Sequence, residues 1–247
     1  MSDSTIQALV ASIPSRVQST RGLLGTLGPL LDRYRGGMPL GFLAAIAQFE
    51  SGGKMTAGDP NLGEYGIFQV AATTPPSFGY PAALRTDTEG NIFLGALEYN
   101  IEAAKQALND PRVSLGSEDS WKLARLGFAI GSGGTQKLLQ ASRGLGGSAW
   151  AAVKAYVDQT GGIPLGSQSA DKVRDRVHAV DVTWAVGQQA AGGSAGLPSI
   201  PPPPAGQPAP RVPAPILAKI ASAHTAQLFV LAGVAAVAAW FFYFRRR

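Results

Sequence analysis

The chain of 247 residues contains no cysteine and only two histidines. Without cysteine there is no disulfide framework, no thiol nucleophile and no thiolate metal site. His178 and His224 are too few for a histidine-rich metal centre. The sequence also lacks a Walker loop, a dinucleotide-binding glycine motif and the H-E-x-x-H zinc motif. We therefore expect neither a metal nor a cofactor.

The first 190 residues carry no excess of either charge. All 16 acidic residues precede residue 191, whereas 5 of the 21 basic residues follow it, so the net charge of +5 belongs to the tail. Nucleic-acid binding requires a basic patch on the folded domain, and we expect no nucleic acid as a partner. A basic tail is typical instead of a segment beside an anionic membrane surface.

The tail contains two unusual segments. Residues 198–215 have 9 prolines in 18 positions, which predicts a semi-rigid, extended spacer. Residues 226–244 contain no charged side chain and are long enough to cross a bilayer, and three arginines follow them. We therefore expect a folded domain at 1–190, a linker rich in glycine and proline at 191–217, and a single-pass membrane anchor at 218–247.

The domain itself predicts an all-α fold. No segment alternates cleanly enough for a strand, whereas apolar residues recur at helical spacing through most of the domain. Residues 56–81 are rich in proline and glycine and predict loops and turns. An interruption is expected at Gly28-Pro29. The expected helices cover residues 6–17, 23–34, 40–51, 91–108, 119–130, 135–141, 148–156 and 171–189.

One carboxyl stands out in this pattern. The segment 40–51 is apolar almost all round, and Glu50 lies in its last turn, before Gly52-Gly53. Because an apolar environment disfavours a charged carboxyl, we expect Glu50 to remain protonated near neutral pH. A protonated carboxyl is what a general acid needs to protonate a glycosidic oxygen. From this position alone, a solvated residue at a helix end is the commoner interpretation.

Two other patterns predict no chemistry. Residues 192–196 match the G-x-S-x-G pattern of serine hydrolases, but they lie in the linker, without the strand and helix that this motif needs. Asp59, Asn61 and Glu64 have a loose likeness to a calcium loop, but the twelve-residue pattern is absent.

A second segment, Gly66-Ile67-Phe68-Gln69, follows about fifteen residues after Glu50-Ser51. The two segments together resemble the signature of the lysozyme-like lytic transglycosylases, which cleave the glycan strands of peptidoglycan. Two later segments of that family have partial counterparts in Asn91-Ile92 with Gly95-Ala96 and in Ala129 to Gly133. The resemblance covers roughly residues 38–160 and implies a lysozyme-like helical domain.

The resemblance also implies a reaction, at the β-1,4 bond between N-acetylmuramic acid and N-acetylglucosamine. Glu50 would protonate the leaving oxygen and then take the proton of the C6 hydroxyl, which gives a 1,6-anhydro product. Ser51 would orient Glu50. Gln69 and the backbone around Gly66 and Phe68 would contact the sugars, because glycine lets a backbone approach a ligand closely. The aromatic side chains that would stack on sugar rings are Tyr65, Phe68, Phe78 and Tyr80.

Departures from the family pattern leave alternatives open. The family's tyrosine in an Ala-Tyr-Asn-x-Gly segment would be Ile130 here, so Tyr99 or Tyr65 would have to supply its hydroxyl. In goose-type lysozymes, an aspartate shortly before a similar segment positions a water molecule. If Asp59 does so here, the product is hydrolysed rather than anhydro. The third alternative is an inactive, membrane-tethered wall-binding module.

A membrane anchor without a secretory signal is similar to the virion-associated transglycosylases of membrane-containing bacteriophages, which open the cell wall at entry. The expected partners are peptidoglycan glycan strands, a lipid membrane through residues 226–244, and membrane or virion proteins. The expected location is a virion membrane or the bacterial inner membrane, with the domain facing peptidoglycan.

Overall fold

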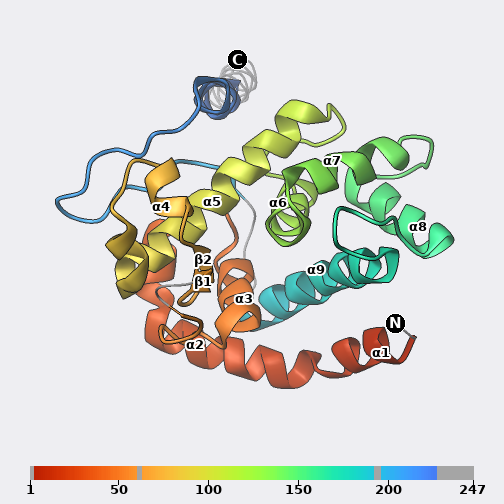
Figure 1. Ribbon diagram of the computed structural model, residues 1–247, viewed down its shortest axis with the longest axis horizontal. Coiled ribbons are helices and arrows are strands. Elements are labelled where there is room, and N and C mark those ends of the chain that lie inside the picture. Colours follow the sequence, from red (N-terminus) through yellow and green to blue (C-terminus); the bar gives the residue numbers. More distant parts are fainter. Residues whose placement is uncertain (1–2, 60–62, 192–195, 227–247) are drawn as a thin grey trace, which may run out of the picture.

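The computed structural model describes residues 3–59, 63–191 and 196–226. The protein is mostly helical, as the sequence predicts (Figure 1). The helices are α1 (Asp3–Ala11), α2 (Ile13–Tyr34), α3 (Leu40–Ser51), α4 (Thr74–Ser77), the 3-10 helix η1 (Ala82–Thr86), α5 (Thr88–Asn109), α6 (Glu118–Ile130), α7 (Ser132–Ala141), α8 (Ala149–Thr160) and α9 (Ala170–Ala191).

A small hairpin lies where only loops and turns were expected. Strands β1 (Glu64–Tyr65) and β2 (Val70–Ala71) pair in antiparallel fashion, with Tyr65 opposite Val70. The two strands bracket the turn that holds residues 66–69. The hairpin therefore fixes the ends of one of the two segments that carry the family resemblance.

The N-terminal helical pattern divides at Ser12. Helix α2 begins at the next residue and has Pro14 in its first turn, where the N–H that proline lacks would have no helical partner. The interruption expected at Gly28-Pro29 is wrong, because α2 continues through Pro29 to Tyr34. Burial of Leu31 and Tyr34 in the core compensates for the hydrogen bond that Pro29 cannot make.

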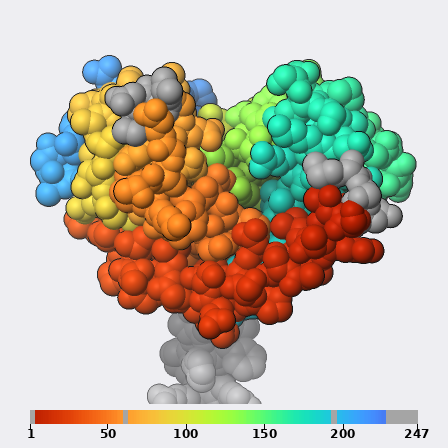
Figure 2. All heavy atoms as spheres, turned by 60° about the horizontal axis from the view of Figure 1, so that its bottom comes forward, coloured from red at the N-terminus to blue at the C-terminus, as the bar shows by residue number. Residues whose placement is uncertain are grey.

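The folded chain forms two lobes, each with its own hydrophobic core. The first core joins α2, α3, α5 and the hairpin turn and contains Phe42, Phe68 and Phe93. The second core joins α6, α7, α8 and α9 and contains Leu138 and Trp150. Figure 2 shows the surface hollowed between the first lobe, in orange and yellow, and the second, in green and teal. Helices α1 and α2, in red, lie along the base of both lobes (Figure 2).

Helix α6 lies between the lobes and contributes to both cores. Trp121 and Ala124 pack in the first core, whereas Leu123 and Leu126 pack in the second. A helix that is apolar on two faces is buried on both. Because α6 packs against both lobes, its remaining side chains lie where the two lobes meet.

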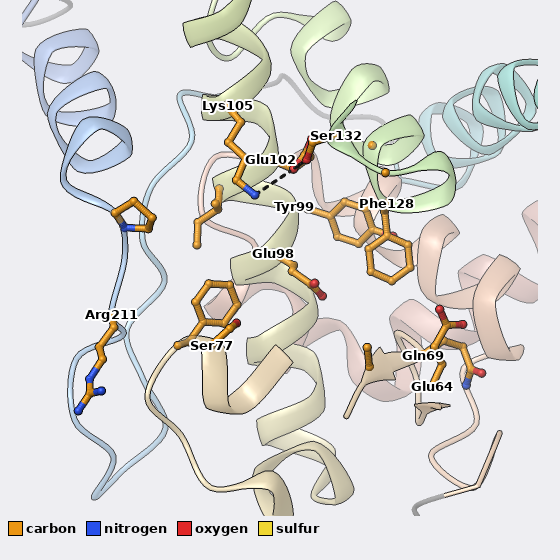
Figure 3. A pocket seen from close by; sticks show the side chains of 16 residues that line it. Glu64, Gln69, Ser77, Glu98, Tyr99, Glu102, Lys105, Phe128, Ser132 and Arg211 are labelled. Atoms are coloured by element: carbon orange, nitrogen blue, oxygen red, sulfur yellow. Dashed lines mark hydrogen bonds and ion pairs between the residues drawn. The ribbon is translucent and has the colours of Figure 1, made fainter. Parts of the chain in front are cut away.

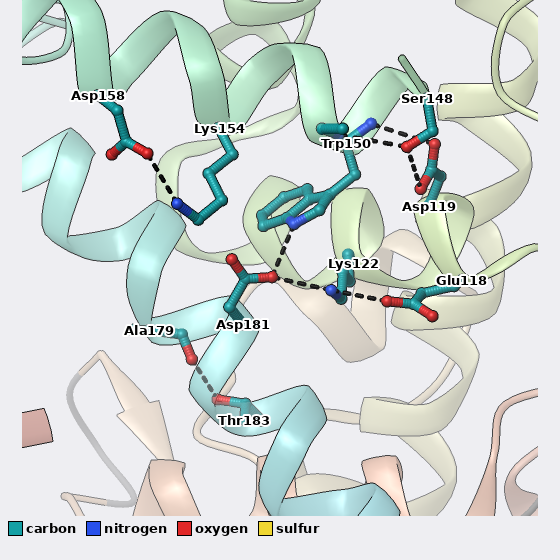
Figure 4. Close-up of polar contacts among 11 residues, drawn as sticks. Glu118, Asp119, Lys122, Ser148, Trp150, Lys154, Asp158, Ala179, Asp181 and Thr183 are labelled. Atoms are coloured by element: carbon teal, nitrogen blue, oxygen red, sulfur yellow. Dashed lines mark hydrogen bonds and ion pairs between the residues drawn. The ribbon is translucent and has the colours of Figure 1, made fainter. Parts of the chain in front are cut away.

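A buried lysine fixes α6 to the second lobe (Figure 4). The Nζ atom of Lys122 lies 2.7 Å from a carboxylate oxygen of Glu118 and 2.8 Å from Oδ1 of Asp181. The same Oδ1 atom accepts a hydrogen bond of 2.8 Å from the indole N–H of Trp150. Because Asp181 belongs to α9 and Trp150 to α8, this network joins three helices and fixes the position of α6.

Residues 196–226 lie against the domain instead of extending away from it (blue in Figure 1). The backbone N–H of Arg211 donates to the carbonyl of Phe78 at 2.9 Å. The hydroxyl of Tyr80 donates to the carbonyl of Pro208 at 2.7 Å. The proline-rich segment is thus held along the first lobe.

A helical stretch from residue 214 to residue 226 continues this segment, and its side chains Ile216 and Ile220 are part of the first core. The extended spacer expected at 198–215 is therefore wrong for these residues: apolar contacts and hydrogen bonds to the domain prevail over projection into solvent. The folded unit continues past the boundary at residue 190 that we expected.

Across the described residues, no helix combines the length and the apolar character needed to cross a membrane. The span expected at 226–244 lies, from residue 227 onward, outside the described residues, as do Asn61 and most of the G-x-S-x-G pattern. The membrane anchor stays a prediction.

Candidate active site

The two segments that resemble a glycan-cleaving signature touch each other directly. The hydroxyl of Ser51, in the last turn of α3, donates to the carbonyl oxygen of Ile67 at 2.8 Å. The same hydroxyl oxygen accepts from the backbone N–H of Gly53 at 3.1 Å. Gly52 has a φ of +66° and ends the helix in the left-handed conformation, as the sequence predicts. Ser51 therefore fastens the end of α3, where Glu50 lies, to the turn at 66–69.

A buried asparagine organises that turn from below. The side-chain amide of Asn91 donates to the carbonyls of Tyr65 at 2.9 Å and Arg85 at 2.8 Å, and its Oδ1 accepts from the N–H of Phe68 at 2.9 Å. Gly66 has a φ of +83°, and a Cβ atom there would lie 2.4 Å from Nδ2 of Asn91. Glycine at position 66 is therefore required by Asn91 and by the backbone conformation, whereas we expected it to admit a sugar.

The next residue, Phe68, is part of the first core. Its side chain is 0% exposed and packs edge-on against Tyr99, with 6.5 Å between ring centroids. Its N–H is already bonded to Asn91. The expectation that Phe68 stacks on a sugar is therefore wrong for this conformation.

Gln69 completes the turn in an unusual backbone conformation. Its φ is +49°, in the left-handed region that residues other than glycine rarely adopt, at a cost of roughly 1–3 kcal/mol. Its side-chain amide donates to the carbonyls of Gly66 at 2.7 Å and Ala57 at 3.2 Å. These two bonds lock the side chain in the turn, where it lines a cavity described below.

Glu50 forms an ion pair with Arg125 of α6, which sequence reasoning did not single out. The two side chains are only 16% and 9% exposed. Arg125 also donates from Nη1 to the hydroxyl of Tyr99 at 3.2 Å. Burial lowers the pKa of the Arg125 guanidinium, but Tyr99 and Glu50 together outweigh it, so the pKa is raised and Arg125 stays charged. Side chains from α3 and α5 thus converge on one arginine of α6.

This pair differs from the apolar environment expected for Glu50. An arginine in contact with a carboxyl stabilises its charged form. We expected a protonated Glu50 from the apolar sequence around it, and that sequence gives no indication of Arg125, which is 75 residues further along. The contact between Glu50 and Arg125 is therefore a feature of the tertiary structure alone.

Tyr99 is fully buried, and it connects the ion pair to a cavity. Burial, the largest effect, raises the pKa of its hydroxyl well above the ordinary value, so Tyr99 is neutral at physiological pH. Its ring lies against Phe128, with 5.1 Å between centroids. Two tyrosines were considered as the source of a hydroxyl. Of these, Tyr99 contacts Arg125, which in turn contacts Glu50.

The cavity has a volume of about 460 Å³, within the range of roughly 300–1,000 Å³ that is common for ligand sites. It lies between the hairpin, α4, α5, the end of α6 and the segment after residue 196 (Figure 3). Glu50 is not among the residues that line it, whereas its neighbours Tyr99 and Gln69 are. The lining residues are Glu64, Gln69, Ala71, Ser77, Phe78, Glu98, Tyr99, Ile101, Glu102, Lys105, Gly127, Phe128, Gly131, Ser132, Arg211 and Pro213.

Glu98 is the unusual carboxyl of the cavity wall. One of its oxygens, Oε1, accepts from the hydroxyl of Thr74 at 3.2 Å. The other, Oε2, is buried and has no hydrogen-bond partner within the described part of the chain, which costs roughly 1–3 kcal/mol. Burial is the main cause that raises the pKa of Glu98 to about 7, and the charges of Glu102 and Glu64 add to it. Its hydrogen bond with Thr74 and the charge of Lys105 act in the opposite direction.

Glu102, one turn further along α5, is fully bonded. It accepts from the amide of Gln106 at 2.5 Å and from the hydroxyl of Ser132 at 2.7 Å, and Lys105 lies 3.4 Å away. These bonds tie α5 to the start of α7. Sequence reasoning missed Glu98 and Glu102, although two glutamates four residues apart, between the apolar positions of the helix expected at 91–108, are a visible signal.

No protein-family model matches the chain, and neither a curated protein nor a solved structure matches it. The site is therefore interpreted from its own geometry and from the resemblance of its two segments.

The remaining predicted residues are distributed around this centre. Asp59 is exposed, next to residues 60–62, which lie outside the description, and it does not line the cavity. Tyr65 is half-buried in β1. Tyr80 is buried in the first core, so the expected stacking on a sugar is wrong for it, whereas Phe78 lines the cavity.

Two further expectations concern residue 130 and metals. Ile130, at the position of the family's tyrosine, packs in the second core and is a structural residue here. The described residues contain no group of three or more acidic, histidine or cysteine side chains that could hold a metal ion.

Proposed function

We propose that the protein is a peptidoglycan lytic transglycosylase with a lysozyme-like helical domain and with Glu50 as its acid and base. The observation that carries the proposal is the hydrogen bond between Ser51 and Ile67, because it joins the two segments of the resemblance into one site. Glu50 lies at the end of a buried helix, with a charged arginine and a neutral tyrosine hydroxyl beside it.

The reaction follows from these groups. In its protonated form, Glu50 gives its proton to the oxygen between N-acetylmuramic acid and N-acetylglucosamine, so that the C1–O bond breaks. The acetamido group of the substrate stabilises the positive centre at C1. Glu50, now a carboxylate that Arg125 stabilises, takes the proton of the C6 hydroxyl, whose oxygen bonds to C1. Glu50 is protonated again, and the product carries a 1,6-anhydro ring.

Arg125 serves the second half of this cycle, because its guanidinium lies against the carboxylate that accepts the proton of the C6 hydroxyl.

The setting of this activity is part of the proposal. Residues 226–244 would anchor the chain in a virion membrane or a bacterial inner membrane, where the domain would face peptidoglycan. The segment at 196–226 lies along the first lobe, so the active domain would stay close to that membrane.

The nature of the product tests the proposal. The full chain is incubated with purified peptidoglycan, and the soluble fragments are weighed by mass spectrometry. Fragments with anhydro ends support the transglycosylase. Fragments with reducing ends would instead support hydrolysis with a water held by Asp59, and binding without release would support an inactive wall-binding module.

A further inference from the structure

One side of the cavity is formed by the chain that follows the domain. Arg211 and Pro213, within residues 196–226, are among the side chains that line the cavity. Figure 3 shows Arg211 on one side of the cavity and Gln69 and Glu64 on the opposite side. We call residues 196–226 the strap, because they lie against the first lobe (blue in Figure 1).

A docked strap conflicts with a polymeric substrate. The cavity of about 460 Å³ has the size of a small-molecule site. A glycan strand is far longer, so a strand that is cut internally must enter the cleft on one side and leave it on another. The strap lies across the side opposite Gln69 and Glu64 and therefore closes that exit.

The strap is hydrogen-bonded to the lobe at separate points. The backbone N–H of Arg211 donates to the carbonyl of Phe78, and the hydroxyl of Tyr80 donates to the carbonyl of Pro208. Of the 18 residues at 198–215, 9 are prolines, which have no N–H to donate. A continuous ladder of backbone bonds therefore cannot form along the strap, and each bond can break without the next.

The apolar attachment of the strap is concentrated in its helical stretch, at two side chains four residues apart. Ile216 and Ile220 are 5% and 6% exposed, whereas Leu217 between them is 42% exposed. One face of this stretch is therefore buried in the first core and the other faces solvent. A segment with few buried apolar contacts opens at a lower free energy than the core around it.

The position of these isoleucines in the chain sets the order of release. They lie between Pro213, at the cavity wall, and residue 226, where the sequence predicts that a membrane anchor begins. A pull from the anchor reaches Ile220 and Ile216 before it reaches Pro213. Movement of the domain away from the membrane would thus free the helical stretch first and open the cavity wall next.

We propose that the strap is autoinhibitory: docked on the first lobe, it closes one side of the cavity to glycan strands, and its release opens that side. The inference rests on the proposed function for the identity of the polymer. It adds regulation to that function, because a domain held at its membrane anchor is closed and a domain drawn away from it is open.

Two pairs of substitutions in the full chain, kept in mild detergent, test the proposal. Both carry Glu50→Gln, so that peptidoglycan stays intact. The release variant has Ile216→Asp with Ile220→Asp, which places charges on the buried face. The matched control has Leu217→Asp with Ala221→Asp, which places the same charges at exposed positions of the same stretch.

Two measurements are made on each chain. Trypsin cleavage after Arg211 reports undocking, because the backbone there must leave its bond with Phe78. Sedimentation with insoluble peptidoglycan reports access to the cleft. In the release variant, cleavage after Arg211 should be faster and peptidoglycan binding tighter, each by about 10-fold or more, because a docked strap leaves only a small binding-competent fraction. The control should match the chain with Glu50→Gln alone.

A milder variant guards against misfolding. Tyr80→Phe removes the hydroxyl that donates to Pro208 and keeps the ring in the first core. It should change both measurements in the same direction as the release variant, by a smaller factor. Circular dichroism checks that every chain is folded.

Several results would overturn the inference. Faster trypsin cleavage with unchanged or weaker binding would show that the strap does not obstruct the cleft. Unchanged cleavage after Arg211 in a folded release variant would show that the isoleucines do not hold the strap. Equal changes in the control, or no binding by any chain, would also contradict it.

Failure of the proposed function is seen separately, in the same variants with Glu50 restored. If none of them releases fragments while the release variant with Glu50→Gln binds more tightly, only the proposed function fails. If fragments appear at the same rate from the release variant and the control, only the autoinhibition fails.

Discussion

Glu50 and Arg125 form an ion pair that joins the end of α3 in the first lobe to α6, the helix between the two lobes. Arg125 adds a hydrogen bond to Tyr99 of α5, so one guanidinium holds three helices at the candidate site. Both partners are largely buried, and removal of one partner of such a pair leaves the other without compensation.

The first prediction concerns the energy of this pair. Arg125→Met is expected to lower the free energy of unfolding by about 3 kcal/mol, because it leaves Glu50 and the Tyr99 hydroxyl without their partner. In a Glu50→Gln background the same substitution should cost less, because no charge is then left behind. Urea unfolding of the four chains measures the coupling, and equal costs in both backgrounds would show that the pair contributes nothing.

The second prediction concerns the bond between Ser51 and Ile67. Ser51→Ala is expected to destabilise the protein by roughly 1–3 kcal/mol, because it removes the hydrogen bond that holds the Ile67 carbonyl to the end of α3. Cleavage should fall as well, since the turn at 66–69 loses its attachment to the Glu50 helix. Ser19→Ala, at an exposed hydroxyl in α2, is the matched control and should leave both unchanged.

The third prediction concerns the glycine of the turn. Gly66→Ala is expected to cost roughly 1–3 kcal/mol, because the residue needs a positive φ and the new Cβ atom would collide with Asn91. Gly22→Ala, in α2, should have the opposite sign and stabilise by about 1 kcal/mol, because its Cβ atom meets nothing within 4 Å. Thermal unfolding compares the two. An unchanged thermal stability of Gly66→Ala would contradict the account of the turn.

The fourth prediction concerns Glu98 and pH. Its pKa in the folded chain, about 7, lies above the ordinary value of 4.5. Below about pH 4.5 this raised pKa stabilises the folded state by its full amount, at most about 3 kcal/mol. The stabilisation is lost as the pH rises to about 7 and beyond. Glutamine at position 98 has no ionisable proton, so the free energy of unfolding of Glu98→Gln should not fall in this way. Urea midpoints across the pH range measure the difference, and parallel curves would refute it.

Local features of the fold were predictable from the sequence. The helical periodicity around α3 and the pair Gly52-Gly53 placed Glu50 in the last turn before a glycine cap, as the structure has it. A helix was expected at 119–130, and α6 is found at Glu118–Ile130, where the hydroxyl of Ser117 caps the first turn by accepting from the N–H of Ser120 at 3.3 Å. These features depend on a few neighbouring residues, which a sequence shows directly.

The rest depends on contacts between distant residues. Nothing near Arg125 in the sequence shows that it will meet Glu50. The burial that raises the pKa of Glu98 arises from the packing of α4 and α5, which periodicity does not place. The composition of 198–215 indicated an extended spacer, but only the structure shows that Ile216 and Ile220 beyond it enter the core.

The central claim is that Glu50 transfers the proton in glycan cleavage, and the rate of fragment release from peptidoglycan by full-length Glu50→Gln tests it most directly. Glutamine has the same shape but cannot give up a proton, so the rate should fall by roughly 10²–10⁴-fold. Asp32→Asn, at an exposed carboxylate of α2 outside the site, should retain the rate of the unsubstituted chain. A folded Glu50→Gln chain that releases fragments as fast as this control would contradict the account.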